Sequence, residues 1–247
     1  MNIILVGCEF AGKTTLANEI VNWSERSLGG SSHFHDHFTI PSSELTGDAS
    51  VEYKNSHPQI KEMFQRFMMT YHASSAFYEN PDHNLMGFHI EEAVYAPIYY
   101  GYGGENSAAP MRSPEGQRTK MARHMEEEIL KSAPEVVLVL MKASPEVIKQ
   151  RMRENVFPSK EITDTQSNSK PFGEPTRGVV QDSDVEFVLD RFQEEFKASL
   201  IKNKIILDTS SLTLAETMAE FLGKMGPFHT ETDRIRMRRY NSGHTHD

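Results

Sequence analysis

Residues 7–14 combine glycines, a lysine and a threonine at a spacing that can bind a polyphosphate. They read Gly-Cys-Glu-Phe-Ala-Gly-Lys-Thr, which matches G-x-x-x-x-G-K-[ST], directly after an apolar run and directly before a helical pattern. The glycines let backbone N–H groups turn toward an anion, and the following helix points its positive end at the same place. We therefore expect a nucleoside triphosphate with Mg²⁺ at these residues: Gly7, Cys8, Glu9, Phe10, Ala11, Gly12, Lys13, Thr14 and Thr15.

Two side chains of this loop have the clearest chemical roles. Lys13 supplies a full positive charge to the β- and γ-phosphates, and the Thr14 hydroxyl suits Mg²⁺. Cys8 is the one cysteine of the chain. Loop N–H dipoles could lower the pKa of its thiol, but we favour the interpretation of a small residue at a tolerant position.

A histidine array is the second pattern that could carry chemistry. His33, His35 and His37 alternate, so on a strand their rings share one face, with Asp36 on the other. Such an array could bind zinc or iron. It is one residue shorter than the metallohydrolase string H-x-H-x-D-H, in which ligand geometry is strict. We favour histidines that form hydrogen bonds or contact a substrate over a metal site.

Strand-like runs alternate with helical patterns along the chain. The strand-like runs cover residues 3–6, 34–40, 85–91, 136–141 and 204–207. The helical patterns cover residues 14–23, 58–77, 116–131, 145–154, 184–202 and 214–223. This alternation predicts an α/β fold with a parallel sheet that is covered on both faces. Residues 101–114, 156–178 and the tail after Gly226 break the pattern.

Composition excludes several classes of protein. The 247 residues include 26 Lys plus Arg and 35 Asp plus Glu, for a net charge of −9. This charge disfavours non-specific electrostatic binding to nucleic-acid phosphates. No apolar run approaches the roughly 20 residues of a membrane span, so we expect no membrane partner. With a single cysteine and no leader-like segment, the expected compartment is the cytoplasm.

Other nucleotide-binding classes lack their signatures here. No [NT]-K-x-D guanine-recognition motif and no D-x-x-G switch are present, which disfavours a regulatory GTPase. No L-S-G-G-Q-like signature is present either, which disfavours a transport ATPase.

Three further stretches resemble the small P-loop kinases that phosphorylate nucleosides and nucleoside monophosphates. Residues 136–153, with Ser144-Pro145-Glu146 and the two arginines Arg151 and Arg153, are similar to the family's fourth strand and lid entrance. Residues 205–210 resemble its fifth strand and adenine-side turn, and residues 36–38 resemble the D-x-F-Y element of uridine kinase-like members. The resemblance extends to about Gly223.

The resemblance implies a particular architecture. It is a three-layer, doubly wound, five-stranded parallel sheet with strand order 2-3-1-4-5 and a helical lid. We expect one kinase domain over residues 1–226, with the lid insert at about 154–180, and a basic, partly disordered tail over 227–247. The tail's arginines, Arg234, Arg236, Arg238 and Arg239, are interpreted as a solvated patch rather than a ligand arm.

The resemblance also assigns roles around the transferred phosphate. Arg151 is favoured over Arg153 for contact with the phosphates, and Arg177 is a further lid candidate. Two roles remain open for Asp36: a general base for an acceptor hydroxyl, or a simple turn or cap residue. Glu91 is expected to close the third strand and to hold Mg²⁺ or its waters.

The acceptor side departs from the family pattern. The family usually has Asp-Arg where this chain has Glu91-Glu92, so an expected arginine is missing. Arg112, Arg118 or Arg123 could replace it, although helix-surface arginines are more often solvated. Tyr95, Tyr99, Tyr100 and Tyr102 could form a stacking wall for a base or pack into the core.

The predicted activity is transfer of the γ-phosphoryl group of ATP, with Mg²⁺, to a small acceptor. A nucleoside or a nucleoside monophosphate is the leading acceptor. The alternatives are a nucleotide-binding regulatory NTPase with no small acceptor, and a kinase of another hydroxylated metabolite or of a polynucleotide. The sequence leaves a homodimer open.

Overall fold

The computed structural model describes residues 1–30, 33–36, 47–79, 82–104, 118–154 and 178–243. Its centre is a five-stranded, all-parallel sheet with the order β2-β3-β1-β4-β5. The strands are β1 Ile3–Gly7, β2 His33–Asp36, β3 His83–Met86, β4 Val137–Lys142 and β5 Asn203–Asp208. This confirms the predicted fold class and strand order.

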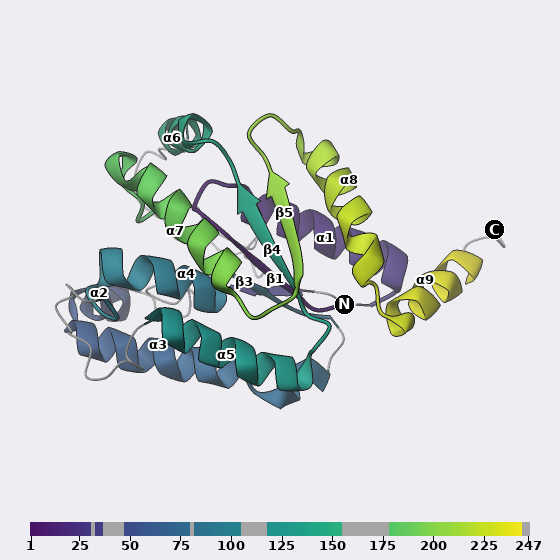
Figure 1. Ribbon diagram of the computed structural model, residues 1–247, viewed down its shortest axis with the longest axis horizontal. Coiled ribbons are helices and arrows are strands. Elements are labelled where there is room, and N and C mark those ends of the chain that lie inside the picture. The colour runs from purple at the N-terminus through teal and green to yellow at the C-terminus, as the bar shows by residue number, and fades with distance from the viewer. Residues whose placement is uncertain (31–32, 37–46, 80–81, 105–117, 155–177, 244–247) are drawn as a thin grey trace.

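Helices cover both faces of the sheet (Figure 1). Those on the face of the first helix are α1 Lys13–Leu28, α8 Leu214–Met225 and α9 Glu231–Gly243, which packs on α1. Those on the other side are α3 Pro58–His72, α4 Phe88–Tyr95, α5 Arg118–Ser132 and α7 Val185–Ala198. The remaining helices are α2 Gly47–Asn55 and α6 Pro145–Glu154. Short helical turns lie at Ser75–Glu79, Ala96–Tyr100, Asp182–Asp184 and Gly226–Phe228.

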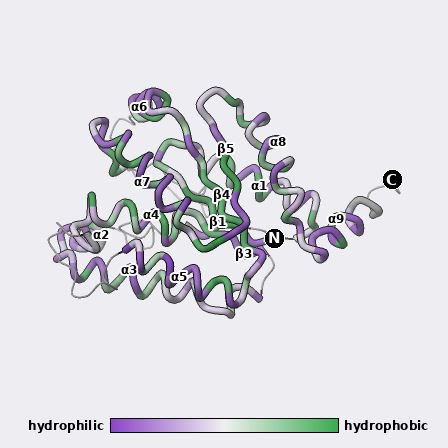
Figure 2. The backbone as a smooth tube through the Cα atoms, viewed as in Figure 1, coloured by the Kyte–Doolittle hydropathy of each residue, from purple (hydrophilic) through white to green (hydrophobic). Residues whose placement is uncertain are grey.

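The apolar residues gather on the strands and on the helix faces that meet them (Figure 2). β1, β3 and most of β4 are buried on both faces, as expected for the inner strands of a parallel sheet. Because parallel strands end at the same edge of the sheet, the segments after β1, β3 and β4 lie together there. None of the described helices is long and apolar enough to cross a membrane.

The third strand is shorter than its apolar run predicts. β3 ends at Met86, and Gly87, with φ 77°, turns the chain directly into α4. Residues 88–95 are buried all round on this helix, so the run has no amphipathic period. A continuous apolar run cannot distinguish a buried strand from a buried helix. The prediction that Glu91 closes a strand is therefore wrong, because Glu91 lies in the first turn of α4.

Most of the segment after Gly226 that the structure describes forms a helix that packs on the domain. α9 follows Gly226 closely and lies along α1, with Thr230 and Asp233 bonded to each other at its start. The Arg236 guanidinium forms two hydrogen bonds with the Asp82 carboxylate, at 2.9 and 2.7 Å, and also donates to Leu28 O. Arg236 is thus a packing residue of the tail rather than a solvated one, whereas Arg238 is exposed.

Candidate phosphate-transfer site

The predicted phosphate loop connects β1 to α1 at the carboxyl edge of the sheet. Gly7 has φ 151°, and a Cβ there would lie 2.2 Å from the Met141 carbonyl oxygen, so only glycine lets β4 pack this closely. Gly12 caps α1 with φ 93°. The first turn of α1 carries no acidic residue. Its N–H groups and the positive end of the helix dipole can therefore attract an anion at the loop.

Lys13 is folded back over the loop. Its ammonium group donates to Gly7 O at 2.6 Å and Cys8 O at 3.2 Å, and forms an ion pair with Glu91 Oε1 at 2.9 Å. Burial lowers the pKa of Lys13, but the Glu91 carboxylate outweighs it and the pKa stays raised. The structure therefore brings together two side chains that the sequence places 78 positions apart, both predicted to act on the phosphates or the metal.

The turn between β3 and α4 places Glu91 against Lys13. Gly87 and Phe88 both have positive φ, at 77° and 48°. A Cβ on Gly87 would lie 2.6 Å from Glu91 Oε2, so the missing side chain leaves room for the carboxylate. A residue such as Phe88 rarely adopts this backbone region, and such conformations cluster at functional sites.

Asp36 lies at the same edge of the sheet. It is the last residue of β2 and is level with Met86, the last residue of β3. The Thr14 hydroxyl lies 3.9 Å from the Met86 sulfur, so the start of α1 also reaches this point. The backbone therefore places Asp36 beside the segment that carries Glu91, while its role as a base stays a prediction.

Other loop residues are held by the surrounding helices. The Glu9 N–H donates to the Tyr95 hydroxyl at 3.0 Å, and the Glu9 carboxylate accepts from the Val180 N–H at 3.1 Å. Burial raises the pKa of the Cys8 thiol to about 12, so it is a thiol rather than a reactive thiolate. Tyr95 is buried and its hydroxyl accepts from the loop, while its contact with an acceptor stays a prediction.

Arg151 joins α6 to the loop. Its guanidinium donates to Phe10 O at 3.0 Å, to Thr209 Oγ1 at 3.1 Å and to Thr209 O at 2.7 Å. Thr209 also donates to Ala11 O, which ties the end of β5 to the same loop. Arg153 instead points to solvent and lies 4.0 Å from Asp182. Arg151 therefore lies beside the loop, and its contact with the phosphates stays a prediction.

The candidate acceptor-side arginines have internal partners. Arg118 is fully buried and forms a bidentate ion pair with Glu92, with nitrogen–oxygen distances of 2.5 to 2.9 Å. Burial raises the pKa of Glu92 and Arg118 opposes that shift; the bidentate geometry is that of an ionised carboxylate. Arg123 lies 3.0 Å from Glu126 and 3.5 Å from Glu195. Arg112 and Arg177 lie outside the described residues.

Several of the candidate tyrosine and histidine side chains contact other side chains of the protein. Tyr95 and Tyr102 are buried, and the Tyr102 hydroxyl donates to Glu92. The His35 ring packs against His72 and His83, with centroids 5.9 and 5.0 Å away. Among the described side chains, no group of three or more His, Cys, Asp or Glu is arranged to hold a metal ion. His37 lies outside the described part of the chain.

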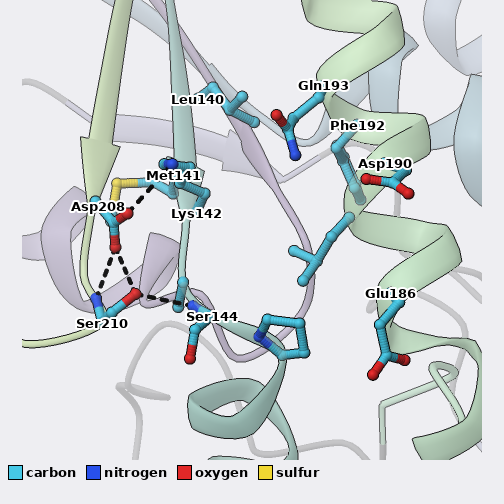
Figure 3. A pocket seen from close by; sticks show the side chains of 13 residues that line it. Leu140, Met141, Lys142, Ser144, Glu186, Asp190, Phe192, Gln193, Asp208 and Ser210 are labelled. Atoms are coloured by element: carbon cyan, nitrogen blue, oxygen red, sulfur yellow. Dashed lines mark hydrogen bonds and ion pairs between the residues drawn. The ribbon is translucent and has the colours of Figure 1, made fainter.

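A cavity of about 400 Å³ lies at the ends of β4 and β5, next to α7 (Figure 3). Asp208 and Ser210 are bonded to each other on one wall, and Glu186 and Asp190 of α7 stand on the other. Carboxylates on opposing walls do not suit a triphosphate, and no residue of the phosphate loop lines the cavity. We therefore do not place the nucleotide there.

Sequence reasoning missed Glu92, Tyr102 and Thr209 as parts of the framework. Glu92 appeared only as a departure from the family pattern, and Thr209 only as part of a turn. Their signals were weak because each acts through a partner that is distant in the sequence, such as Arg118 or Arg151. The positive φ of Phe88 had no sequence signal apart from the preceding glycine.

Comparison with known proteins agrees on the fold. No protein-family model matches the sequence, and no curated protein matches it. A structure of deoxyadenosine kinase from M. mycoides with bound dCTP matches 92% of this chain and 100% of its own, at 14% identity and a TM-score of 0.53. The same kinase with bound dATP matches 92% and 100%, at 13% identity and a TM-score of 0.51.

These matches confirm the fold-level resemblance to P-loop nucleoside kinases. The shared feature is the α/β fold, which in this chain has an all-parallel sheet with order 2-3-1-4-5. At 13–14% identity the likeness shows the fold alone. The chain therefore has the fold of the deoxyadenosine kinases.

Proposed function

We propose that this protein is an ATP- and Mg²⁺-dependent kinase that phosphorylates a hydroxyl group of a nucleoside. The observation that carries the proposal is the contact of Lys13 with both the phosphate loop and Glu91. Phosphoryl transfer needs a phosphate cradle, a metal, cationic groups and an oriented acceptor. The fold shared with the deoxyadenosine kinases supports a nucleoside as that acceptor.

The loop and Lys13 would bind the triphosphate. In the structure, Glu91 offers Lys13 the negative charge that the β- and γ-phosphates would offer on binding. Triphosphate binding would therefore exchange one ion pair of Lys13 for another. The released Glu91 carboxylate would then be available at the phosphates.

The oxygen donors at this point fit Mg²⁺. The Thr14 hydroxyl and the Glu91 carboxylate are hard oxygen ligands, and Mg²⁺ is usually held by one or two such groups together with substrate phosphates. The metal would neutralise charge on the transferred group. Arg151, at the Phe10 carbonyl of the loop, would be the nearest arginine to the same phosphates.

A nucleoside fits the structure better than a nucleoside monophosphate. A monophosphate acceptor needs an arginine for its phosphate, and the two candidates within the described residues, Arg118 and Arg123, are occupied by buried carboxylates. A hydroxyl acceptor needs a base instead, and Asp36 ends β2 at the correct edge of the sheet. We propose Asp36 as that base.

An acceptor panel tests the proposal. ATP consumption with Mg²⁺ would be measured with nucleosides, deoxynucleosides, their monophosphates, sugars and oligonucleotides, with Lys13→Ala as the blank. We expect stimulation by at least one nucleoside and none in the blank. Stimulation by a monophosphate alone contradicts the acceptor class. ATP hydrolysis that no acceptor stimulates favours the alternative of a regulatory NTPase.

The base is tested separately. Asp36→Asn should lower kcat by about 100-fold or more with little change in nucleotide binding, as expected for loss of a general base. Unchanged turnover in Asp36→Asn contradicts this role while leaving the kinase proposal in place.

A further inference from the structure

His89 of α4 forms a pair with Glu126 of α5, a neighbouring helix in Figure 1. His89 Nε2 lies 2.9 Å from Glu126 Oε1, and both side chains are fully buried. Burial raises the pKa of Glu126, but the bonds and charges of His89 and Arg123 outweigh it and the pKa is lowered. Glu126 is therefore a carboxylate that only accepts, and His89 Nε2 donates the hydrogen bond. The proposed reaction makes no use of this pair.

Glu126 is held from two other sides. Its Oε2 accepts from the Leu200 N–H at 2.7 Å, shortly before β5, and lies 3.0 Å from Arg123 Nε. The carboxylate thus joins α4, α5 and the segment that leads into β5. His89 Nδ1, by contrast, has no hydrogen-bond partner among the described residues. The imidazole is therefore held through Nε2, and Glu126 is the group that holds it.

The pair lies directly after the strained turn between β3 and α4. Gly87 has φ 77° and Phe88 has φ 48°, and the Gly87 N–H donates to Leu5 O at 2.8 Å. Backbone in such regions persists only where the surrounding structure holds it. His89 is the next residue, so its bond to Glu126 holds the chain at the point where the turn becomes a helix.

The position of His89 also sets the position of Glu91. An α-helix turns about 100° per residue, so Glu91 lies about 200° round α4 from His89. His89 accordingly faces α5, whereas Glu91 faces the phosphate loop, with Oε1 2.9 Å from Lys13 Nζ. Glu92 is held on the α5 side as well, by Arg118. Rotation of α4 about its axis therefore cannot move Glu91 away from Lys13 without breaking the contacts with α5.

We propose that His89 is a positioning residue for Glu91. Its bond to Glu126 fixes the first turn of α4, so that the Glu91 carboxylate faces Lys13 in the free protein and the metal in the proposed reaction. His89 itself touches no reacting group, because its ring is fully buried. The effect on turnover rests on the proposed function, whereas the effect on the turn rests on the contacts alone.

Two substitutions of His89 separate positioning from packing. His89→Leu removes the donor, whereas His89→Gln keeps an N–H donor of similar reach. In His89→Leu, kcat should fall by about 10–100-fold and the Mg²⁺ concentration for half-maximal turnover should rise by about 10-fold, as for loss of a group that orients a metal ligand. The KM for the nucleoside should stay within about threefold, because Glu91 does not hold the acceptor. His89→Gln should keep all three values within about threefold of the wild type.

Hydrogen exchange of the nucleotide-free chain tests the positioning without any turnover. In His89→Leu, the backbone amides of residues 87–91 should exchange at least about 10-fold faster than in the wild type, while those of α8 stay unchanged. Thr119→Val is the matched control, because it removes a 2.7 Å bond from α5 to Glu195 of α7 and leaves the His89–Glu126 pair intact. Thr119→Val should change neither the exchange of residues 87–91 nor the Mg²⁺ requirement.

Glu126→Asp covers the case in which His89→Leu fails to fold. It keeps a negative charge near Arg123 but withdraws the carboxylate from His89 by one methylene group. Exchange of residues 87–91 should again become faster and the Mg²⁺ requirement should again rise, both by less than in His89→Leu.

Several results overturn the proposal. Unchanged exchange of residues 87–91 in folded His89→Leu or Glu126→Asp does so, as does faster exchange with an unchanged Mg²⁺ requirement. A His89→Gln variant as impaired as His89→Leu contradicts the role of the donor. An equal rise in the Mg²⁺ requirement in Thr119→Val would show a general loss of packing instead. If no acceptor stimulates ATP consumption by the wild type, the kinase proposal fails, and the exchange of residues 87–91 alone decides whether His89 positions Glu91.

Discussion

Glu91 has two roles that can be separated by substitution. In the structure it holds Lys13, and in the proposed reaction it faces the metal. Glu91→Gln removes the charge but keeps the shape. We expect kcat to fall by about 100-fold or more, as for loss of a group that acts on the transferred phosphate. ATP binding without Mg²⁺ should tighten, because Lys13 no longer has a competing carboxylate and the triphosphate no longer meets a negative charge.

Turnover and equilibrium nucleotide binding measure these two effects. Glu220→Gln is the matched control, because Glu220 pairs with Lys224 on the exposed surface of α8. It should change neither quantity. Equal loss of turnover in both variants would show that the effect of Glu91→Gln is not specific to the site.

Gly87 is a position at which one added carbon atom should lower the stability of the fold. Gly87→Ala forces a Cβ against the Glu91 carboxylate and onto a backbone with φ 77°. We expect the free energy of unfolding to fall by about 1–3 kcal/mol. Gly223→Ala in α8 meets nothing within 4 Å and should stabilise by about 0.5–1 kcal/mol. Urea unfolding of the two variants measures the contrast, and equal effects would contradict the strained turn.

At the scale of elements, α4 and α5 are joined by the buried Glu92–Arg118 pair. Arg118→Met leaves Glu92 buried without its cation, which should cost about 3–5 kcal/mol of unfolding free energy at pH 8. The double variant Glu92→Gln with Arg118→Met should recover part of this loss, because no uncompensated charge remains. Urea unfolding measures both variants. A double variant as unstable as the single one contradicts the argument.

The Arg118→Met variant should also show a stronger pH dependence of stability than the wild type. Burial raises the pKa of Glu92 even with Arg118 present, and removal of the guanidinium raises it further. A carboxyl with a raised folded-state pKa stabilises below its unfolded pKa and loses this contribution as the pH rises through the folded value. Relative to the wild type, Arg118→Met should therefore be more stable at pH 5 than at pH 8, by urea unfolding at both.

The same two helices show how far sequence reasoning reaches. The phosphate loop was predictable, because a local motif fixes the first strand, the loop and the first helix in one stretch. The sheet order followed only from the resemblance to the small P-loop kinases. α4 was not, since its apolar residues have no helical period and a left-handed turn starts it. The partners of Glu91 and Glu92 were not predictable either, because Lys13 and Arg118 meet them only after the sheet and helices have assembled.

At the scale of the whole molecule, the chain gathers positive charge locally against a net charge of −9. Lys13 and Arg151 lie at the loop, while Arg118 and Arg123 are neutralised inside the protein. Of these four cations, Lys13 and Arg151 are the two placed beside the phosphate loop. A local pair of cations of this kind would suit a small anionic ligand such as a triphosphate.

The end of the molecule away from the phosphate loop contains contacts that stabilise the fold and take no part in the proposed reaction. α9 is clamped to the turn before β3 by Arg236 and Asp82, and Arg236 also donates to the carbonyl of Leu28 at the end of α1. Arg236→Gln breaks a largely buried pair and should lower the free energy of unfolding by about 2–4 kcal/mol. ATP turnover in the folded variant should stay unchanged, because the phosphate loop lies at the other end of α1.

Arg238→Gln is the control. It loses only an exposed ion pair and should lower the free energy of unfolding by less than about 0.5 kcal/mol. Urea unfolding and turnover at 25 °C measure both variants; lost turnover in folded Arg236→Gln would place α9 in the catalytic machinery instead.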